Sequence, residues 1–62
     1  MKANADIRET ASMSGVKQWE IAEALGKSES WLSTKMRKEL PEELKLKIFV
    51  IIGQIEKRRV NE

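Results

Sequence analysis

The sequence contains no cysteine, no histidine and no tyrosine, and only one proline. The absence of cysteine excludes a disulfide framework and a thiolate metal site. Without histidine, zinc would have only carboxylate ligands, and the usual acid–base chemistry and catalytic triads have no base. No phosphate-binding loop is present. We therefore expect a protein that is not an enzyme, with no metal, no cofactor and no small-molecule substrate.

Long apolar runs are also missing. No stretch of 18 apolar residues exists, so no transmembrane helix is expected. The first six residues hold no apolar signal core, which predicts a cytoplasmic protein without a membrane partner. The 62 residues are 40% hydrophobic and 35% charged, a composition typical of a small globular domain. No linker or repeat divides the chain, so we expect a single domain over residues 1–62.

The charges are segregated along the chain, although the net charge is only +2. Residues 27–38 carry four basic side chains against one acidic side chain, and residues 57–59 form a second basic cluster. Basic segments of this kind attract phosphate backbones. The alternative is that both clusters are solvated faces of helices.

The spacing of apolar residues predicts four helices with short connections, over 4–13, 18–25, 28–37 and 41–59. Asn4 and Ser28 are suitable N-caps, and Pro41 fits the first position of a helix. Gly15 and Gly26 suit the left-handed residue that follows a helix. The sequence therefore predicts an all-α bundle of three short helices and one long C-terminal helix.

The connection between the second and third helices is the most informative part of the pattern. A short turn containing Gly26 joins two short helices, which is the helix-turn-helix arrangement. Ala22 is small where the two helices would cross, and Ile21, Leu25 and Leu32 supply an apolar seam between them.

Residues 18–37, with the sequence QWEIAEALGKSESWLSTKMR, resemble the twenty-residue motif of the lambda-repressor-like (Cro/C1-type) helix-turn-helix family. The whole chain is similar to the very small regulators of this kind in prophages and mobile elements. The resemblance implies a compact helix-turn-helix bundle that binds double-stranded DNA and regulates transcription, often as a dimer on a two-fold site. Lys17 and Lys27 depart from the family, which usually has Ser or Thr and an apolar residue at these positions.

In this motif the third helix enters the major groove and the second crosses the backbone. With Leu32 and Met36 facing inward, the expected base contacts are Glu29, Ser30, Ser33, Thr34 and Arg37. The expected phosphate contacts are Lys17, Gln18, Lys27, Ser28, Lys35 and Lys38. For Ser28 the alternative is a purely capping role, and for each lysine it is simple solvation. Trp19 is expected to cover the edge of the core. Trp31 lies either against sugar–phosphate or between the third and fourth helices.

The fourth helix has two apolar stripes at helical spacing. The first can cover the other helices and comprises Leu44, Ile48, Ile51, Ile52 and Ile55. The second has no partner within so short a chain and comprises Leu46, Phe49, Val50, Gly53 and Val60. An exposed apolar stripe indicates association, so we predict a homodimer through this helix. The alternative is a monomer in which Phe49 joins the core.

Three functions are compatible with this pattern. The leading one is a sequence-specific DNA-binding transcriptional regulator. An excisionase-like accessory protein that binds DNA during recombination would need the same surface. A helix-turn-helix scaffold that docks a protein partner through the second stripe is the alternative from another class, and Glu29 on the third helix favours it.

Overall fold

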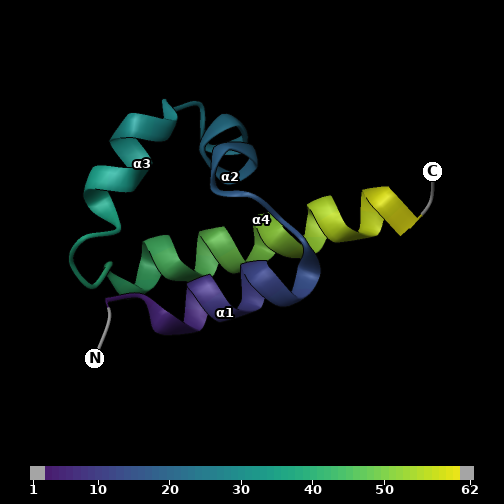
Figure 1. The fold of residues 1–62 in the computed structure, drawn as a ribbon, viewed down its shortest axis with the longest axis horizontal. Coiled ribbons are helices and arrows are strands. Elements are labelled where there is room, and N and C mark those ends of the chain that lie inside the picture. Colours follow the sequence, from purple (N-terminus) through teal and green to yellow (C-terminus); the bar gives the residue numbers. More distant parts are fainter. Residues whose placement is uncertain (1–2, 61–62) are drawn as a thin grey trace.

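The computed structural model describes residues 3–60, and this part of the chain folds into four helices without any strand. They are α1 (Ala5–Ser14), α2 (Gln18–Leu25), α3 (Glu29–Lys35) and α4 (Glu42–Val60). Helices α1 and α4 lie side by side, and α2 packs against both α3 and α4 (Figure 1). The all-α fold of three short helices and one long helix is thus confirmed. None of the helices between residues 3 and 60 combines the length and apolarity needed to cross a bilayer.

Two glycines end α1 and α2 as the sequence predicts. Gly15 and Gly26 have φ values of 68° and 74°, in the left-handed region where a side chain is disfavoured. After each glycine the next N–H returns to the helix, from Val16 to the Ala11 carbonyl and from Lys27 to the Ala22 carbonyl, both at 2.9 Å. This Schellman-type closure satisfies carbonyls that would otherwise lack partners, and it reverses the chain over a very short connection.

The core is built around the first apolar stripe of α4, as the sequence predicts. Ile48, Ile51, Ile52 and Ile55 are all buried, and each such side chain contributes roughly 1.5–3 kcal/mol through removal from water. The other buried apolar residues come from α1, α2, α3 and the connections: Ile7, Ala11, Val16, Ile21, Ala22, Leu32, Met36 and Leu40. The core therefore joins all four helices, and α3 is held to it by Leu32 and Met36.

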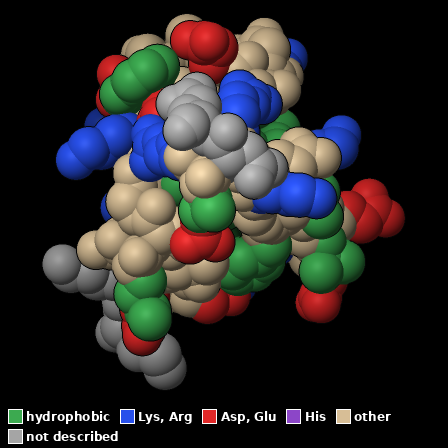
Figure 2. Space-filling view, turned by 90° about the vertical axis from the view of Figure 1, so that its right-hand side faces the viewer, with side chains coloured by type: hydrophobic (Ala, Val, Ile, Leu, Met, Phe, Trp, Pro, Cys, Tyr) green, Lys and Arg blue, Asp and Glu red, His purple; other side chains and the backbone are tan. Residues whose placement is uncertain are grey.

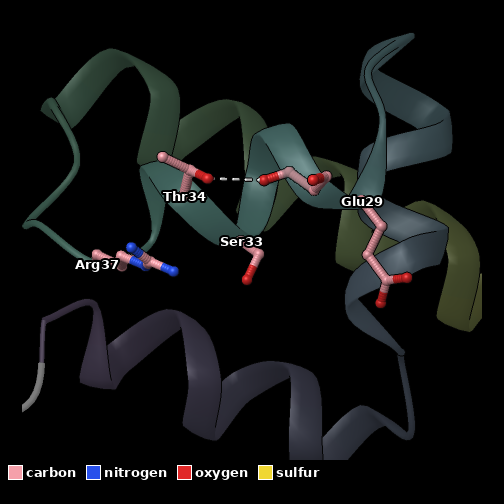
Figure 3. A pocket seen from close by; sticks show the side chains of 5 residues that line it. Glu29, Ser33, Thr34 and Arg37 are labelled. Atoms are coloured by element: carbon pink, nitrogen blue, oxygen red, sulfur yellow. Dashed lines mark hydrogen bonds between the residues drawn. The ribbon is translucent and has the colours of Figure 1, made fainter.

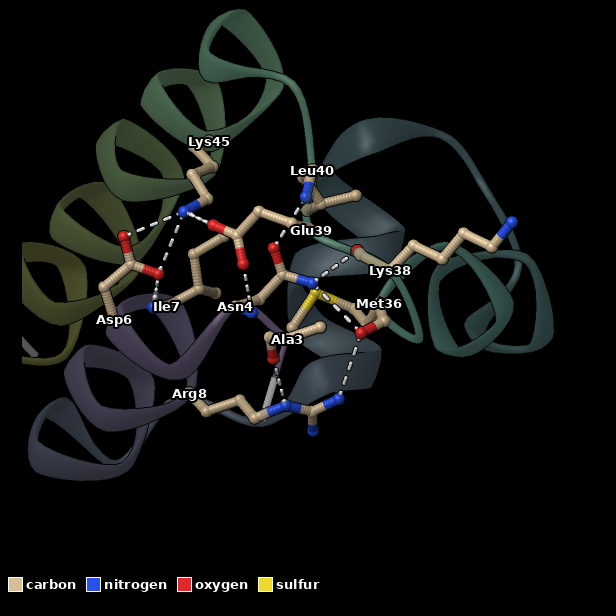
Figure 4. A network of polar contacts seen from close by, with 10 residues as sticks. All are labelled: Ala3, Asn4, Asp6, Ile7, Arg8, Met36, Lys38, Glu39, Leu40 and Lys45. Carbon is tan, nitrogen blue, oxygen red and sulfur yellow. Dashed lines mark hydrogen bonds and ion pairs between the residues drawn. The ribbon is translucent and has the colours of Figure 1, made fainter. Parts of the chain in front are cut away.

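Asn4 does not cap α1 with its side chain, contrary to the sequence-based prediction. The residue is 0% exposed and adopts a left-handed conformation with φ 58°, which turns the amide away from the helix. Its Nδ2 donates to the carbonyls of Met36 (3.0 Å) and Lys38 (2.8 Å), while its Oδ1 accepts from the Leu40 N–H at 2.8 Å (Figure 4). Asn4 therefore ties the start of α1 to the connection between α3 and α4.

The same amide explains why α3 ends at Lys35, two residues before the predicted end at Arg37. In a continuous helix the Met36 carbonyl would accept from the Leu40 N–H. Here both groups bond the Asn4 side chain instead, one to its nitrogen and the other to its oxygen. The chain can leave the helix at this point without a buried polar group losing its partner.

Polar contacts hold α4 to its neighbours near both of its ends. Near its beginning, Lys45 pairs with Asp6 at 3.1 Å and with Glu39, which in turn accepts the Asn4 backbone N–H at 2.8 Å (Figure 4). The hydrogen bond from Lys45 holds the pKa of the Asp6 carboxyl below its ordinary value. At the far end, Arg59 donates to the Gly15 carbonyl and pairs with Glu20 of α2.

Glu20 also stabilises the start of α2, because the Lys17 side chain before this helix has no oxygen that could act as a cap. Its carboxylate accepts the Lys17 backbone N–H at 2.7 Å, which satisfies one donor at the helix start. This hydrogen bond is the main reason why the pKa of Glu20 lies below its ordinary value, and the Arg59 guanidinium adds to the effect.

The second apolar stripe of α4, which we call its outer face, is only partly exposed to solvent. Leu46, Val50 and Val60 are 58%, 59% and 79% exposed, whereas Phe49 is half-buried and packs against the core. Helical spacing alone predicts Phe49 in the dimer interface, whereas the structure packs part of its side chain against the core of the single chain. The remaining exposed positions form an apolar face with Gly53 among them.

Candidate nucleic-acid interface

The orientation of α3 follows from its cap and its two buried anchors. The Ser28 hydroxyl accepts the Trp31 N–H at 3.0 Å, so the predicted N-cap is confirmed. Leu32 and Met36 are 1% and 4% exposed, and they fix which side of α3 faces the core. The opposite positions must then face solvent, because successive residues turn by about 100° around the helix.

The five residues expected to contact bases lie together around one open hollow of about 340 Å³. They are Glu29, Ser30, Ser33, Thr34 and Arg37. Figure 3 shows Glu29 and Arg37 at the two ends of this hollow, with Ser33 between them. Arg37 belongs to the turn after α3 rather than to the helix, and its side chain nevertheless lies beside the others. We call this set the reading face.

The chemistry of the reading face is varied. The Thr34 hydroxyl donates to the Ser30 carbonyl at 3.0 Å (Figure 3), so its hydrogen is used within the helix, while its oxygen can still accept and its methyl group offers an apolar contact. Arg37 is exposed, and no ion pair between residues 3 and 60 engages its guanidinium. The reading face therefore offers the hydroxyl groups of its two serines, the methyl group of Thr34, the guanidinium of Arg37 and the carboxylate of Glu29.

The residues expected to contact phosphates lie at the start of α2, in the turn before α3, at the end of α3 and in the connection that follows, and Lys35 and Lys38 line a second hollow with Thr34 and Arg37. Lys17, Lys27, Lys35 and Lys38 are exposed, and Gln18 is half-buried. Ser28 is exposed as well, with its hydroxyl already used as a cap. Lys and Arg side chains also gather where α4 finishes (Figure 2). In that second cluster Arg59 has a structural role, because it is committed to Glu20 and Gly15.

The two tryptophans have different surroundings. Trp31 is half-buried and packs against the core, with the ammonium groups of Lys27 and Lys35 at 5.4 and 5.7 Å from its ring centre. Trp19 is 52% exposed and lines a hollow between α2 and α4 together with Ile55. Trp31 therefore packs against the core with one part of its ring, while both of its sequence-based alternatives remain predictions.

Sequence reasoning missed two residues that position the end of α3. Asn4 bonds the backbone on both sides of Arg37, and the Arg8 Nη2 donates to the Met36 carbonyl at 3.3 Å. Both lie near the beginning of the chain, about 30 residues from the groups they hold. No local pattern points to such contacts.

The short helices α2 and α3, joined by a tight turn at Gly26, form a helix-turn-helix arrangement. Residues 13–50, from the end of α1 to the middle of α4, match the KorB domain, a DNA-binding domain of helix-turn-helix type in plasmid partitioning and repressor proteins. Because this match spans more than half of the chain, the protein belongs to the KorB domain family. No curated protein and no solved structure matches the chain.

The family match confirms the coarser part of the sequence-based identification. A DNA-binding domain of helix-turn-helix type was expected, and the matched family is of that kind. The family is the KorB domain rather than the lambda-repressor type that the motif resembles, so the lambda-type assignment is not supported.

Proposed function

We propose that the protein binds double-stranded DNA sequence-specifically, with α3 in the major groove, and acts without enzymatic activity as a transcriptional regulator of a phage or another mobile element in the cytoplasm. The observation that carries this proposal is the reading face, where five exposed polar side chains meet around one open hollow. Its donors and acceptors suit base edges, and the exposed lysines of the motif suit phosphates.

Each group of the reading face has a base for which it is suited. The Arg37 guanidinium can donate two hydrogen bonds to the O6 and N7 of a guanine, and the Thr34 methyl group can contact the methyl group of a thymine. Ser30 and Ser33 can bond either donors or acceptors, and Glu29 can accept from a cytosine amino group. The lysines and Gln18 would fix the register of the protein on the duplex without specifying its sequence.

We further propose a homodimer through the outer face of α4. A Cβ atom added at Gly53 would meet nothing within 4 Å, so no contact inside the chain requires glycine there. Glycine inside a helix costs about 1 kcal/mol relative to alanine. Close packing of a second helix at this point would explain why glycine is present there. The same helix would cover the exposed side chains of Leu46 and Val50.

The charges of α4 favour an antiparallel arrangement of the two helices. Glu42 and Glu43 occupy its first turn, and the basic side chains of its last turn include Lys57 and Arg58. Antiparallel packing brings the acidic end of each helix to the basic end of the other. In the usual geometry of such dimers the two copies of α3 are about 34 Å apart, one turn of DNA.

Two other functions use parts of the same surface. An excisionase-like accessory protein would bind DNA through the same reading face. A protein-interaction module would instead use the outer face of α4, and the exposure of Leu46 and Val50 favours it. In that case a larger partner would take the place of the second copy.

The test is a selection from random duplex DNA at two salt concentrations, followed by sequencing of the bound fraction. We expect affinity to fall steeply with salt and the bound fraction to contain a short palindrome with half-sites one turn apart. Enrichment of a single half-site would retain the reading face and refute the dimer. A lack of binding at low salt would refute the DNA function and favour the protein-interaction module.

The dimer is tested separately by Gly53→Leu. Because the space around Gly53 is empty in the single chain, leucine should leave the fold intact and block the close approach of a second helix. We expect sedimentation equilibrium to show at least a tenfold weaker dimer, which corresponds to about 1.4 kcal/mol. Gly53→Ala is the matched control, since it changes the same position with a single methyl group. A wild-type protein that sediments as a monomer would refute the interface.

A further inference from the structure

We propose that Lys27, Trp31 and Lys35 form one binding site for the DNA backbone, in which Trp31 is a positioning residue that holds both ammonium groups. We call this set the backbone site. The inference rests on the proposed function and adds a role for the tryptophan, which neither the fold nor the family match assigns.

One aromatic ring brings together two lysines from different parts of the motif. Lys27 lies in the turn before α3 and Lys35 is the last residue of that helix, yet their ammonium groups are 5.4 and 5.7 Å from the centre of the Trp31 ring. The negative face of an aromatic ring attracts cations at such distances. Neither lysine takes part in an ion pair among residues 3–60. Both charges therefore remain available to an anion.

The Trp31 side chain is packed against the core. Trp31 is half-buried, and its backbone N–H is bonded to the Ser28 hydroxyl at 3.0 Å. Lysine side chains are long and flexible, so an exposed lysine alone loses conformational freedom when it binds a phosphate. A ring anchored in the core limits that freedom before DNA arrives. This anchoring distinguishes the backbone site from the other exposed lysines.

The backbone site borders the reading face. At about 100° per residue, Trp31 lies about 60° around α3 from Thr34, and Lys35 follows about 40° further on. When the reading face is turned toward base edges, this flank of the helix lies toward the wall of the groove. The wall consists of sugars and phosphates, which are the groups that two cations and an apolar ring fit.

The two ammonium groups are close enough together to contact one strand. The two distances to the ring centre limit the separation of the ammonium groups to about 11 Å. Nucleotides along one strand of B-DNA rise by about 3.4 Å each, so two cations within this limit can contact neighbouring phosphates on the same strand. Such contacts add affinity and salt dependence, but no sequence preference.

The experiment measures how the affinity for a selected duplex depends on salt, in wild type and in variants. We expect Trp31→Leu to reduce the slope of log affinity against log salt by about one to two units, while the preferred sequence stays the same. Trp31→Phe should retain most of the wild-type slope, because phenylalanine keeps the aromatic face. Trp19→Leu changes the other tryptophan, which also is partly exposed, and should leave the slope unchanged.

A double-mutant cycle separates positioning from a merely structural role. In a protein that already carries Lys27→Met and Lys35→Met, Trp31→Leu should have no further effect on the slope. A thermal melt of each variant checks that it is folded at the temperature of the binding assay. An unchanged slope in folded Trp31→Leu, with normal DNA binding by the wild type, refutes the backbone site alone. A wild type that binds no DNA at low salt refutes both this site and the proposed function.

Discussion

Replacing Asn4 with alanine is expected to lower the free energy of unfolding by about 3–5 kcal/mol, because three backbone groups lose a buried or part-buried hydrogen bond to its side chain and a left-handed residue gains strain. The groups are the carbonyls of Met36 and Lys38 and the N–H of Leu40. A domain of this size has only a few kcal/mol of stability in total. Chemical unfolding followed by far-ultraviolet circular dichroism should therefore show a largely unfolded variant at 25 °C.

Two further variants separate the causes of this loss. Asn4→Gly removes the same hydrogen bonds but tolerates φ 58°, so it should be about 1–2 kcal/mol more stable than the alanine variant. Lys45→Ala removes the neighbouring ion pairs with Asp6 and Glu39 and should cost less than about 1 kcal/mol, since both carboxylates are more than half exposed. If Asn4→Ala stays within 1 kcal/mol of the wild type, the amide does not bridge the connection as described.

The helices were predictable because their signals are local. Gly15 and Gly26 mark two helix ends, Ser28 marks a beginning, and the apolar spacing of α4 identifies Ile48 and its neighbours as core. The early end of α3 was not predictable. It depends on Asn4, whose bonds to the connection span more than 30 residues, and its local context suggested only a helix cap.

Part of the candidate site could also be predicted from local signals, and part could not. Once Leu32 and Met36 are assigned to the core, helical spacing alone places Ser33 and Thr34 on the outer face, and the structure brings them to one hollow. The grouping of Lys27 with Trp31 was not inferred, although the two are four residues apart. That spacing indicates contact only within a helix, and Lys27 precedes the cap of α3, so its placement depends on the turn.

For the reading face, Arg37→Ala is expected to have the largest effect on DNA recognition. The lost bidentate contact should cost about 1–3 kcal/mol on a selected site, a reduction in affinity of roughly 5- to 150-fold. The preference should relax at one base pair and remain at the others. Competition binding with duplexes that differ at each position measures both effects.

The residue that follows Arg37 provides a control for this variant. Lys38 is the next residue and is also exposed, but it was expected to contact a phosphate. Lys38→Ala should weaken binding to all sequences alike and reduce the salt slope by about one unit, without relaxing any preference. Arg37→Lys keeps the charge but loses the planar fork, so it should resemble Arg37→Ala in its base preference while retaining more non-specific affinity. If Arg37→Ala instead weakens all sequences equally, the guanidinium binds the backbone, and the base preference must come from the side chains that remain on the reading face.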